Sequence, residues 1–386
     1  MGVKILSLFD GMACGMIAMS LAGVEVESYD AYEIDKYAIK AAQHNFQMIK
    51  EHGDVFDADF TQYEGVDFLI GGSPCTYWSI AQTKNRETVA SGMGWELFSQ
   101  YVRALHEAKP KYFIYENNKS MSKQIRASID EAFGFEAVLI NSALVSAQNR
   151  QRLYWVGKRN ADGTYSKVNV EQPADRGVLL RDVLDTGIAW NEKAYNLTTR
   201  CCGAVPEDTL KRHRHTMVAE PVRGIENDTK SRTLTANYWK TNVRDAFVDC
   251  AGGRTMAAEP VSYCTDKNME HLMRNFTDGK TQTLSPSHIP NVIEHKDGKE
   301  ITIYEVRDGK ITIKGKQYPI KLKDGFYIIR KLTVSECKRL QTVPEWYEFP
   351  VSNSQAYKML GNGWTCEVIA HLIRSCIAEQ WGGVDG

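Results

Sequence analysis

Residues 67–79 read DFLIGGSPCTYWS: a short apolar run passes directly into a loop that contains two glycines and a proline. Such a run, bounded by turn residues, is typical of a buried strand. The loop carries Cys75 at the end of this strand. A lone cysteine is more often an inert core residue, but the glycines and the proline predict a loop rather than a core strand. Cys75 is therefore a candidate nucleophile.

The segments on either side of this loop alternate between short apolar runs and helical patterns. Residues 3–9 and 26–32 read as buried strands, followed by helices over about 16–22 and through residue 45. Residues 112–115 and 152–156 read as later strands. Strands that alternate with helices predict an α/β fold, with a parallel sheet covered on both faces. The loops after the strands then share one edge of the sheet, where ligands bind in such folds.

The pattern changes after about residue 160, where glycine, asparagine, threonine and lysine become frequent. Residues 301–331 read as short strands separated by three dipeptides that favour hairpin turns: Asp308-Gly309, Lys314-Gly315 and Asp324-Gly325. A Lys-x-x-x-Leu-Thr/Ser frame begins at residues 193, 230 and 280. Unless the likeness is accidental, this frame predicts three similar polar turns in one small domain.

Helical pattern returns after residue 330. Thr333 and Glu336 have the spacing of a capping box, so we expect a helix to begin there. The last predicted helix covers about residues 365–381.

Composition indicates a globular protein, because 43% of the 386 residues are hydrophobic and 25% are charged. The N-terminus does not read as a signal peptide, and no run of about 18 apolar residues predicts a membrane span. Nine cysteines without framework spacing favour a reduced, cytoplasmic protein. Residues 189–330 hold 23 basic and 18 acidic residues, although the whole chain has a formal charge of −1. This local excess favours a polyanionic partner over an ordinary solvated surface only modestly.

Three acidic or glycine-bearing turns follow the first predicted strands. Residues 9–15 form a small-residue turn that lets the backbone approach a cofactor. Glu33, at the end of the second strand, is placed to accept both hydroxyls of a ribose, unless it is simply an acidic residue near a helix N-terminus beside Asp35. Asp54 is placed to accept from an adenine amino group. The first turn has no lysine, so the set suits an adenosyl ligand without phosphates.

Two further polar segments complete a candidate site with Cys75. Glu116 follows the strand at 112–115, and Arg150 and Arg152 lie on one side of a later extended segment. Carbon 5 of cytosine is a poor nucleophile until a thiolate adds at carbon 6. A protonated Glu116 can donate to ring nitrogen 3, and an arginine can hold the carbonyl oxygen at position 2. The combination therefore suits the activation of a pyrimidine.

These motifs together resemble the DNA cytosine-5 methyltransferase family over roughly residues 3–160 and 328–386. The resemblance rests on Pro74-Cys75, Glu116-Asn117, the Gln148/Arg150/Arg152 pattern, residues 330–341 and Gly361-Asn362-Gly363. It implies a Rossmann-like sheet that binds S-adenosylmethionine (SAM), with an inserted, irregular β-rich target recognition domain. The implied divisions are 1–179 and 329–386 for the catalytic domain and 180–328 for recognition. The implied partner is double-stranded DNA, and we expect a monomer without a metal ion.

The resemblance also assigns roles to individual residues. Cys75 is the nucleophile, Glu116 acts at ring nitrogen 3, Arg152 contacts the cytosine carbonyl and Arg150 supports the catalytic loop. A cytosine must leave the duplex to reach Cys75, so base flipping is implied. The residues implied to line the cofactor pocket are Phe9, Asp10, Gly11, Glu33, Ile34, Asp54, Val55, Pro74, Leu97, Asn362, Gly363 and Trp364.

Predicted DNA contacts come from the catalytic domain and from the middle segment. The first set is Ser79, Gln82, Lys84, Arg86, Asn117 and Gln148. The second is Arg212 and Arg214 in a basic cluster suited to phosphates, with Arg232, Tyr238, Lys240 and Arg244 for base edges. A zinc site from Cys201, Cys202, His213 and His215 is the competing interpretation, but its ligand spacing is poor.

Three positions depart from the family pattern: Ala13-Cys14, Asn118 and Trp364. They leave open a modified form of SAM as the donor, whereas the catalytic groups are intact. The sequence is also compatible with a catalytically silent DNA-binding relative and with an RNA cytosine-5 methyltransferase. Methylation of an amino group is disfavoured, because the loop carries Ser-Pro-Cys rather than Pro-Pro-aromatic. Phage DNA modification and restriction-modification are both compatible with the resemblance.

Overall fold

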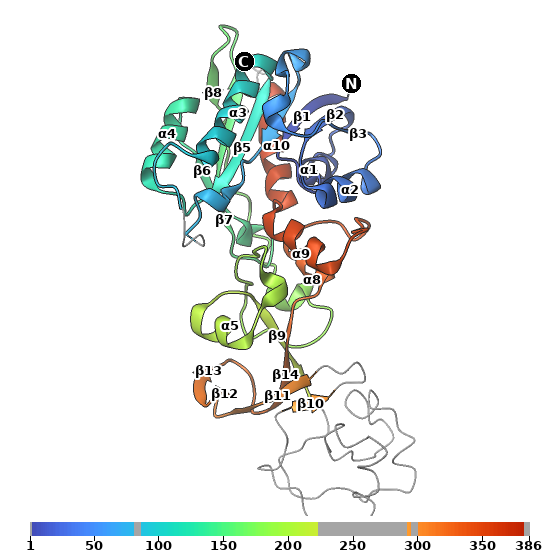
Figure 1. Cartoon of the computed structure of the whole chain (residues 1–386), viewed down its shortest axis with the longest axis vertical. Coiled ribbons are helices and arrows are strands. Elements are labelled where there is room, and N and C mark those ends of the chain that lie inside the picture. Colours follow the sequence, from blue (N-terminus) through green and yellow to red (C-terminus); the bar gives the residue numbers. More distant parts are fainter. Residues whose placement is uncertain (1, 81–85, 223–291, 295–299, 382–386) are drawn as a thin grey trace, which may run out of the picture. The chain divides into compact units, whose positions relative to one another are not determined.

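The computed structural model describes residues 2–80, 86–222, 292–294 and 300–381 (Figure 1). The chain forms two compact units. Unit 1 contains residues 1–183, 193–203 and 333–386, and unit 2 contains residues 184–192 and 204–332. The first copy of the Lys-x-x-x-Leu-Thr frame, at residue 193, belongs to unit 1 and not to the smaller unit in which we expected it. The other two copies lie outside the described residues.

Unit 1 is built on an eight-stranded sheet with the order β3-β2-β1-β4-β5-β7-β6, in which β8 also pairs with β7. The first five strands along the chain are parallel, whereas β7 runs antiparallel to β5 and to β6. The strands are β1 (Val3–Leu8), β2 (Val26–Tyr32), β3 (Ile49–Glu51), β4 (Phe68–Gly71), β5 (Tyr112–Asn118), β6 (Val138–Asn141), β7 (Gln151–Arg159) and β8 (Tyr165–Lys167).

The antiparallel placement of β7 differs from the all-parallel sheet that we expected. Only residues 142–150 join β6 to β7. A parallel pair needs a crossover of a dozen or more residues, whereas antiparallel neighbours can be joined by a short connection. The predicted α/β class is nevertheless confirmed, because the central strands are parallel and helices separate most of them along the chain.

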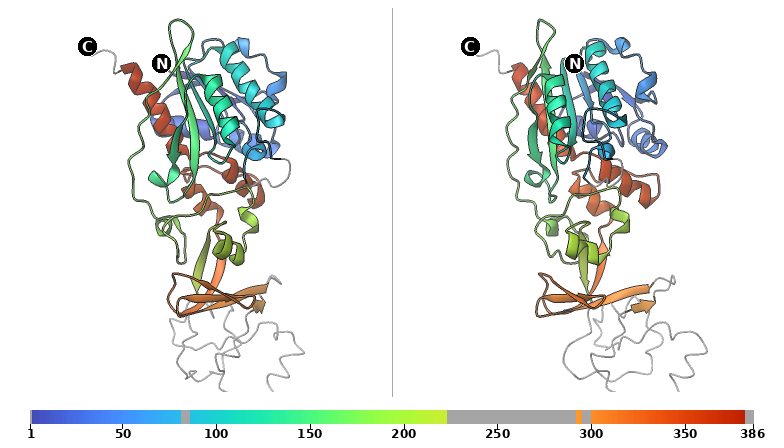
Figure 2. Two further views of the ribbon diagram at one scale, coloured as in Figure 1. Left: turned by 90° about the vertical axis from the view of Figure 1, so that its left-hand side faces the viewer. Right: turned by 60° about the vertical axis from the view of Figure 1, so that its left-hand side comes forward.

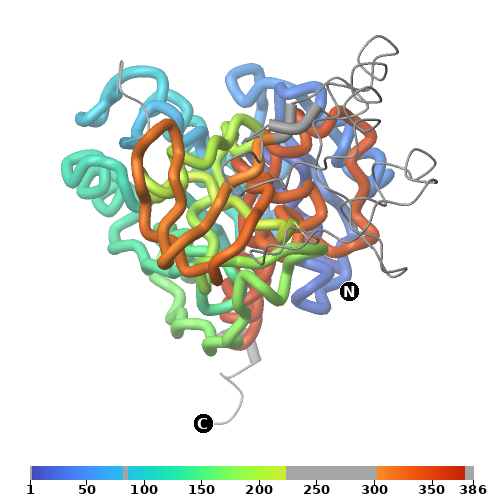
Figure 3. Tube along the Cα trace, turned by 90° about the horizontal axis from the view of Figure 1, so that it is seen from below, coloured from blue at the N-terminus to red at the C-terminus, as the bar shows by residue number. Residues whose placement is uncertain are grey.

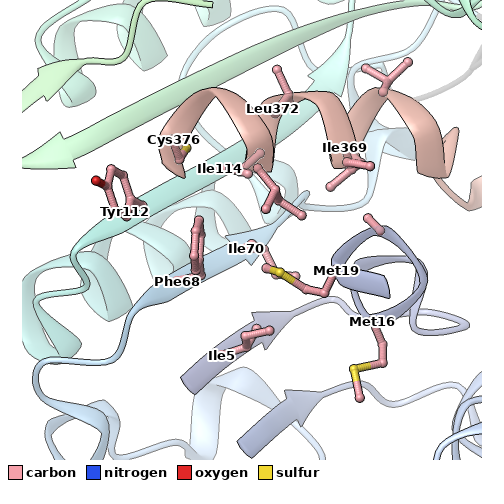
Figure 4. Packing of buried hydrophobic residues seen from close by; sticks show 14 of the residues in the cluster. Ile5, Met16, Met19, Phe68, Ile70, Tyr112, Ile114, Ile369, Leu372 and Cys376 are labelled. Carbon is pink, nitrogen blue, oxygen red and sulfur yellow. The ribbon is translucent and has the colours of Figure 1, made fainter. Parts of the chain in front are cut away.

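Helices cover both faces of this sheet (Figure 2). Alternate strand residues point to opposite faces. Phe68 and Ile70 belong to a buried cluster with α1 and α10 (Figure 4), whereas Leu69 belongs to a second cluster with α3 and α4. The helices of unit 1 are α1 (Cys14–Ala22), α2 (Lys36–Asn45), α3 (Met93–Ala108), α4 (Lys123–Phe133), α8 (Val334–Leu340), α9 (Asn353–Asn362) and α10 (Cys366–Trp381).

Close packing explains why glycine follows Cys14 in α1. A Cβ atom at Gly15 would lie 2.3 Å from Cδ1 of Ile70 and 2.7 Å from the hydroxyl of Tyr29. Glycine therefore allows α1 to lie against the sheet beside the turn that follows β1.

At the other end of the chain, α8 begins at the predicted capping box: the Thr333 hydroxyl accepts from the Glu336 amide, and the Glu336 carboxylate accepts from the Thr333 amide.

Unit 2 contains an antiparallel sheet with the order β13-β12-β11-β14-β9, with β10 paired to β11. The tube of Figure 3 draws the course of residues 302–331 in orange. Two of the three predicted hairpins are present, because Asp308-Gly309 joins β11 to β12 and Lys314-Gly315 joins β12 to β13. Asp324-Gly325 does not form the third, since β14 pairs with β11 and β9 rather than with β13. The helix and strands of unit 2 are α5 (Pro206–Arg212), β9 (Met217–Pro221), β10 (Val292–Glu294), β11 (Glu300–Arg307), β12 (Lys310–Ile313), β13 (Lys316–Pro319) and β14 (Gly325–Lys331).

The primed turn geometry of the two hairpins follows from their residues. Asp308 and Gly309 have φ angles of 50° and 65°, and Lys314 and Gly315 have φ angles of 49° and 74°. Positive φ at both central residues defines a type I′ turn, whose twist matches that of the two flanking strands.

Among the described residues, no helix is long and apolar enough to cross a membrane.

Candidate active site

The loop after β4 holds Cys75 at the first position of a single 3₁₀ turn, Cys75–Tyr77. The Cys75 side chain is half-buried, and Pro74 and Thr76 beside it are exposed. Below them Ser73 is buried, with its hydroxyl 2.6 Å from the hydroxyl of Tyr115 in β5. The side-chain amide of Asn117 donates to the carbonyl of Ser73 at 3.2 Å. Strand β5 thus anchors the base of the loop and leaves the thiol accessible.

Glu116 lies on β5 next to this loop, and it is paired with Arg152 of the neighbouring strand β7. The Arg152 Nε atom is 3.0 Å from Oε1 of Glu116, and both side chains are only 12% exposed. The indole N–H of Trp364 donates to the other oxygen, Oε2, at 3.0 Å. A Cβ atom at Gly72 would lie 3.0 Å from that same oxygen. The loop that carries Cys75 is therefore packed directly against the Glu116 carboxylate.

Arg150 is close in sequence to Arg152 but has a different environment. Its guanidinium is buried and donates to four oxygens: the side chain of Asn196 and the carbonyls of Leu197, Gly361 and Gly363, at 2.7 to 3.2 Å. Burial, with the nearby charge of Arg152, lowers the pKa of Arg150 to about 10, so it remains protonated at neutral pH. Arg150 thus joins residues 196–197 to the turn after α9.

Three of the predicted DNA contacts have internal partners instead. Asn117 and Gln148 are 0% exposed. Gln148 donates to the carbonyl of Leu340 and accepts from the amide of Leu197. Arg86 donates to the carbonyls of Trp78 and Ser120. In the structure these three side chains therefore brace the segments around Cys75 and Glu116, and their predicted contact with DNA stays a prediction.

The remaining predicted DNA residues fall into three groups. Ser79 lies on the Cys75 loop, where its amide donates to the carbonyl of Cys75 at 2.9 Å. Arg212 and Arg214 are exposed in unit 2, at and just after the end of α5. Gln82, Lys84, Arg232, Tyr238, Lys240 and Arg244 lie outside the described residues.

The predicted cofactor residues follow the carboxyl ends of the parallel strands β1 to β4, which share one edge of the sheet. The turn after β1 is held in an unusual conformation, with φ angles of 58° at Phe9, 62° at Gly11 and 59° at Ala13. Glu33 fixes this turn, because its Oε2 accepts from the Gly11 amide at 2.8 Å. Ile34 is 74% exposed, as expected of a side chain that a bound ligand would cover.

The other residues that the sequence predicts for the cofactor pocket lie on different elements of unit 1. Asp54 is exposed and Val55 is buried, at the turn after β3. Leu97 of α3 packs against the second buried cluster. Gly363, at the end of α9, meets the turn after β1: a Cβ atom there would lie 3.2 Å from Sγ of Cys14. The residues Gly361–Trp364 are thus brought next to the first turn, although more than 340 positions separate them in the sequence.

Two of the departures from the family pattern, Ala13 and Asn118, lie in the following local surroundings. Ala13 adopts the left-handed conformation that a glycine adopts without strain, and it precedes the first residue of α1. Asn118 is buried, and its side-chain oxygen accepts from the hydroxyl of Ser120 at 2.6 Å.

Among the described residues, no three His, Cys, Asp or Glu side chains are grouped so that they could hold a metal ion.

Buried carboxylates gather where the cofactor is expected. Oδ1 of Asp10 accepts from the hydroxyls of Ser7 and Tyr29, whereas its Oδ2 is buried and has no hydrogen-bond partner among the described residues. Both oxygens of Glu51, at the end of β3, are likewise buried without a partner there. Burial raises the pKa of Asp10 to about 6. Burial and the charges of Asp10 and Glu33 raise the pKa of Glu51 to about 8.

These orphaned carboxylates fit a cationic ligand. SAM carries an ammonium and a sulfonium group, and a positive charge nearby favours the ionised form of a carboxyl group. Phe9, Glu33, Ile34 and Asp54, which the sequence predicts for the adenosyl part, follow β1, β2 and β3 at this end of the sheet. Glu51 was missed by sequence reasoning, because its only signal is a charged side chain in a three-residue strand, opposite Ala31 of β2.

Comparisons with known proteins identify the family of the chain. The sequence model of the C-5 cytosine-specific DNA methylase family matches residues 3–378. The orphan methyltransferase M.SPRI of Bacillus phage SPR is 26% identical, over 97% of each chain. The type II methyltransferase M.NlaX of Neisseria lactamica is 26% identical, over 98% of this chain and 95% of its own.

Solved structures show the same fold at lower sequence identity. The S. pombe Dnmt2 methyltransferase superposes with a TM-score of 0.54 at 13% identity, over 98% of this chain and 99% of its own. A putative DNA modification methyltransferase encoded within an E. coli prophage gives a TM-score of 0.50 at 16% identity, over 99% and 100%. The chain therefore belongs to the C-5 cytosine-specific DNA methylase family and is a DNA (cytosine-5-)-methyltransferase.

Proposed function

We propose that the protein transfers a methyl group from SAM to carbon 5 of a flipped-out cytosine, in a specific duplex sequence, through a covalent Cys75–carbon 6 intermediate. The observation that carries this proposal is the packing of the Cys75 loop, at Gly72, against a Glu116 carboxylate that is already paired with Arg152. Nucleophile, acid and carbonyl-binding cation thus lie on three adjacent strands or their loops.

In this mechanism each side chain acts on a different atom of the base. The Cys75 thiolate adds to carbon 6 while Glu116 donates a proton to ring nitrogen 3. Arg152 donates to the oxygen at position 2, where negative charge develops, and carbon 5 becomes nucleophilic. When bound, SAM supplies an electrophilic methyl group. Loss of the carbon 5 proton, departure of the Cys75 sulfur and return of the nitrogen 3 proton to Glu116 then restore the aromatic ring.

Recognition of the target sequence is the role that we propose for unit 2. It carries the exposed Arg212 and Arg214, and its sequence lies in the more basic part of the chain. Arginines of this kind contact phosphates and hold the duplex while one base is extruded. The phage and bacterial relatives suggest that this takes place in the cytoplasm of a bacterial or phage-infected cell.

Cys75→Ala tests the covalent step. We expect methyl transfer from labelled SAM to DNA to fall below detection, while binding to the same duplex is retained, because only the nucleophile is removed. Cys202→Ala is the matched control, since Cys202 is also a half-buried cysteine but belongs to a different turn, Cys201–Gly203. Wild-type transfer by the Cys75 variant would overturn the mechanism.

The product identifies the donor. Nucleosides from DNA of cells that express the protein are expected to contain 5-methylcytosine by mass spectrometry, and bisulfite sequencing gives the target site. If the cytosines carry a heavier substituent and 5-methylcytosine is absent, the donor is a modified form of SAM. Such a result would leave the role of Cys75 unchanged.

A further inference from the structure

Both oxygens of the Glu116 carboxylate have N–H donors in the structure. Arg152 reaches Oε1 from β7, and Trp364 reaches Oε2 from the turn between α9 and α10, each at 3.0 Å. Trp364 is thus in contact with the catalytic acid itself, in addition to lying beside the residues that we expect to line the cofactor pocket. A carboxylate has about four lone-pair positions, so two remain for the edge of a base.

The backbone that carries Trp364 is held from several directions. The carbonyl of Gly363, its neighbour, accepts from the Arg150 guanidinium at 2.7 Å and from the side-chain amide of Gln341 at 3.0 Å. The hydroxyl of Thr365, on its other side, donates to Gln341 at 2.9 Å. The indole therefore comes from a fixed support and does not depend on a freely moving loop.

The Cys75 loop encloses the same contact. A Cβ atom at Gly72 would lie 2.8 Å from the Glu116 carbonyl, 3.0 Å from its Oε2 atom and 3.5 Å from Nε1 of Trp364. A Cβ atom would be too close to Glu116, so glycine lets the loop lie against this carboxylate, with the indole at ordinary contact distance. Loop, carboxylate and indole form one packed unit, in which the orientation of the carboxylate is fixed by its neighbours.

We propose that Trp364 is a positioning residue that acts through Glu116, because its indole N–H fixes the carboxyl plane before the base arrives. The inference rests on the proposed function of Glu116 as the group at ring nitrogen 3. A glutamate side chain loses rotational freedom when it is ordered, and a base that meets an already oriented acid avoids that loss in the transition state. The expected gain is about tenfold in rate.

The addition step can be measured without any cofactor. When the Cys75 sulfur bonds to carbon 6 and nitrogen 3 takes the proton of Glu116, carbon 5 becomes an enamine carbon that accepts a proton from water. Loss of the original hydrogen from carbon 5, with departure of the sulfur and return of the nitrogen 3 proton, regenerates cytosine. DNA labelled with tritium at carbon 5 of cytosine therefore releases tritium to water, and the rate reports the addition step without methyl transfer.

We expect Trp364→Phe, which keeps an aromatic ring and removes the N–H, to lower tritium release about tenfold at saturating DNA. Trp346→Phe is the matched control, because Trp346 is 53% exposed, and its rate is expected to equal that of the unsubstituted protein. A Trp364→Phe rate within twofold of the control would overturn the inference.

A double-substitution cycle separates positioning from a loss of structural integrity. Glu116→Asp shortens the side chain by one methylene, which withdraws the carboxyl from the indole but keeps an acid. We expect Trp364→Phe to have less than a twofold effect in that background. A tenfold effect in both backgrounds would assign Trp364 a merely structural role. Absence of tritium release by the unsubstituted protein, or its persistence in Cys75→Ala, would instead contradict the proposed function.

Discussion

Two arginines separated by one residue illustrate how burial and partners divide their roles. Arg152 is paired with an acid that we assign to chemistry, and its side chain retains some exposure. Arg150 is buried, and all four of its acceptors are protein oxygens on segments distant in sequence. A planar guanidinium can satisfy several carbonyls at once, whereas an ammonium cannot reproduce that fork.

Lysine substitutions should therefore separate the two residues. Arg150→Lys is expected to lower the free energy of unfolding by about 2–4 kcal/mol, because buried carbonyls such as that of Gly363 lose their donors. Arg152→Lys is expected to cost less stability than Arg150→Lys, because lysine keeps the charge beside Glu116, but to reduce methyl transfer roughly 100-fold. Urea denaturation and single-turnover assays measure the two effects. Equal losses of stability in both variants would contradict the division.

At the level of elements, the edge formed by β1, β2 and β3 gathers acidic groups that are costly without a ligand. Ser7, Ala31 and Glu51 occupy equivalent positions on these strands, so their side chains point to the same face of the sheet. Ser7 donates to Asp10, whose charge acts on Glu51. Unpaired buried carboxylates are the kind of local cost that proteins retain at functional sites.

This cost predicts how stability depends on pH. Burial raises the pKa of Glu51 from 4.5 to about 8, so between these values the folded chain holds a proton that the unfolded chain has lost. Stability therefore falls as pH rises through that window. Glu51→Gln should remove this part of the fall and raise the melting temperature by several degrees at pH 8, with little change near pH 5.

Melting curves from pH 5 to 9 without ligand test this prediction. Glu27→Gln is the control, because Glu27 is an exposed carboxylate that pairs with Lys4, and its curve should follow that of the unsubstituted protein. If Glu51→Gln melts at the same temperature as the unsubstituted protein at pH 8, Glu51 does not carry the buried charge.

Local sequence patterns predicted several elements because the controlling interactions are short in range. The Cys75 loop, the hairpins at Asp308-Gly309 and Lys314-Gly315, and the capping box at Thr333 each depend on residues a few positions apart. The antiparallel course of β7 was not predicted, because a short apolar strand reads alike in either direction. The third expected hairpin, at Asp324-Gly325, failed because β14 pairs with strands distant in sequence.

The sequence predicted the motifs that make up the candidate site, but not the contacts between them. The resemblance placed Glu116 and Trp364 in different roles, and their contact joins positions 248 residues apart. Asn117 and Gln148 were expected to contact DNA, since polar residues in catalytic motifs read as ligand groups. Their burial depends on how Ser73 and residues 340–341 pack against them, which no local pattern reveals.

At the scale of the whole molecule, the residues that we assign to catalysis lie in unit 1, and the charged surface that we assign to DNA recognition lies in unit 2. Unit 1 is assembled from three stretches of sequence and contains the Cys75 loop, Glu116 and the carboxylate edge. Unit 2 contains α5 and the basic cluster that follows it. Arg212 pairs with Asp208 at 3.2 Å, whereas Arg214 has no ion-pair partner among the described residues. Arg214 is thus the better candidate for a phosphate contact.

The salt dependence of DNA binding tests that assignment. Each phosphate that a basic residue neutralises releases counterions and adds about 0.9 to the slope of log affinity against log salt concentration. Arg214→Gln should lower the slope by about that amount, measured by fluorescence anisotropy with a duplex between roughly 50 and 200 mM salt. Lys4→Gln removes the same charge from β1 of unit 1, beside Glu27, and should leave the slope unchanged. Equal slopes for both variants would mean that Arg214 does not touch the backbone, and that the basic cluster acts only through the average field of the protein.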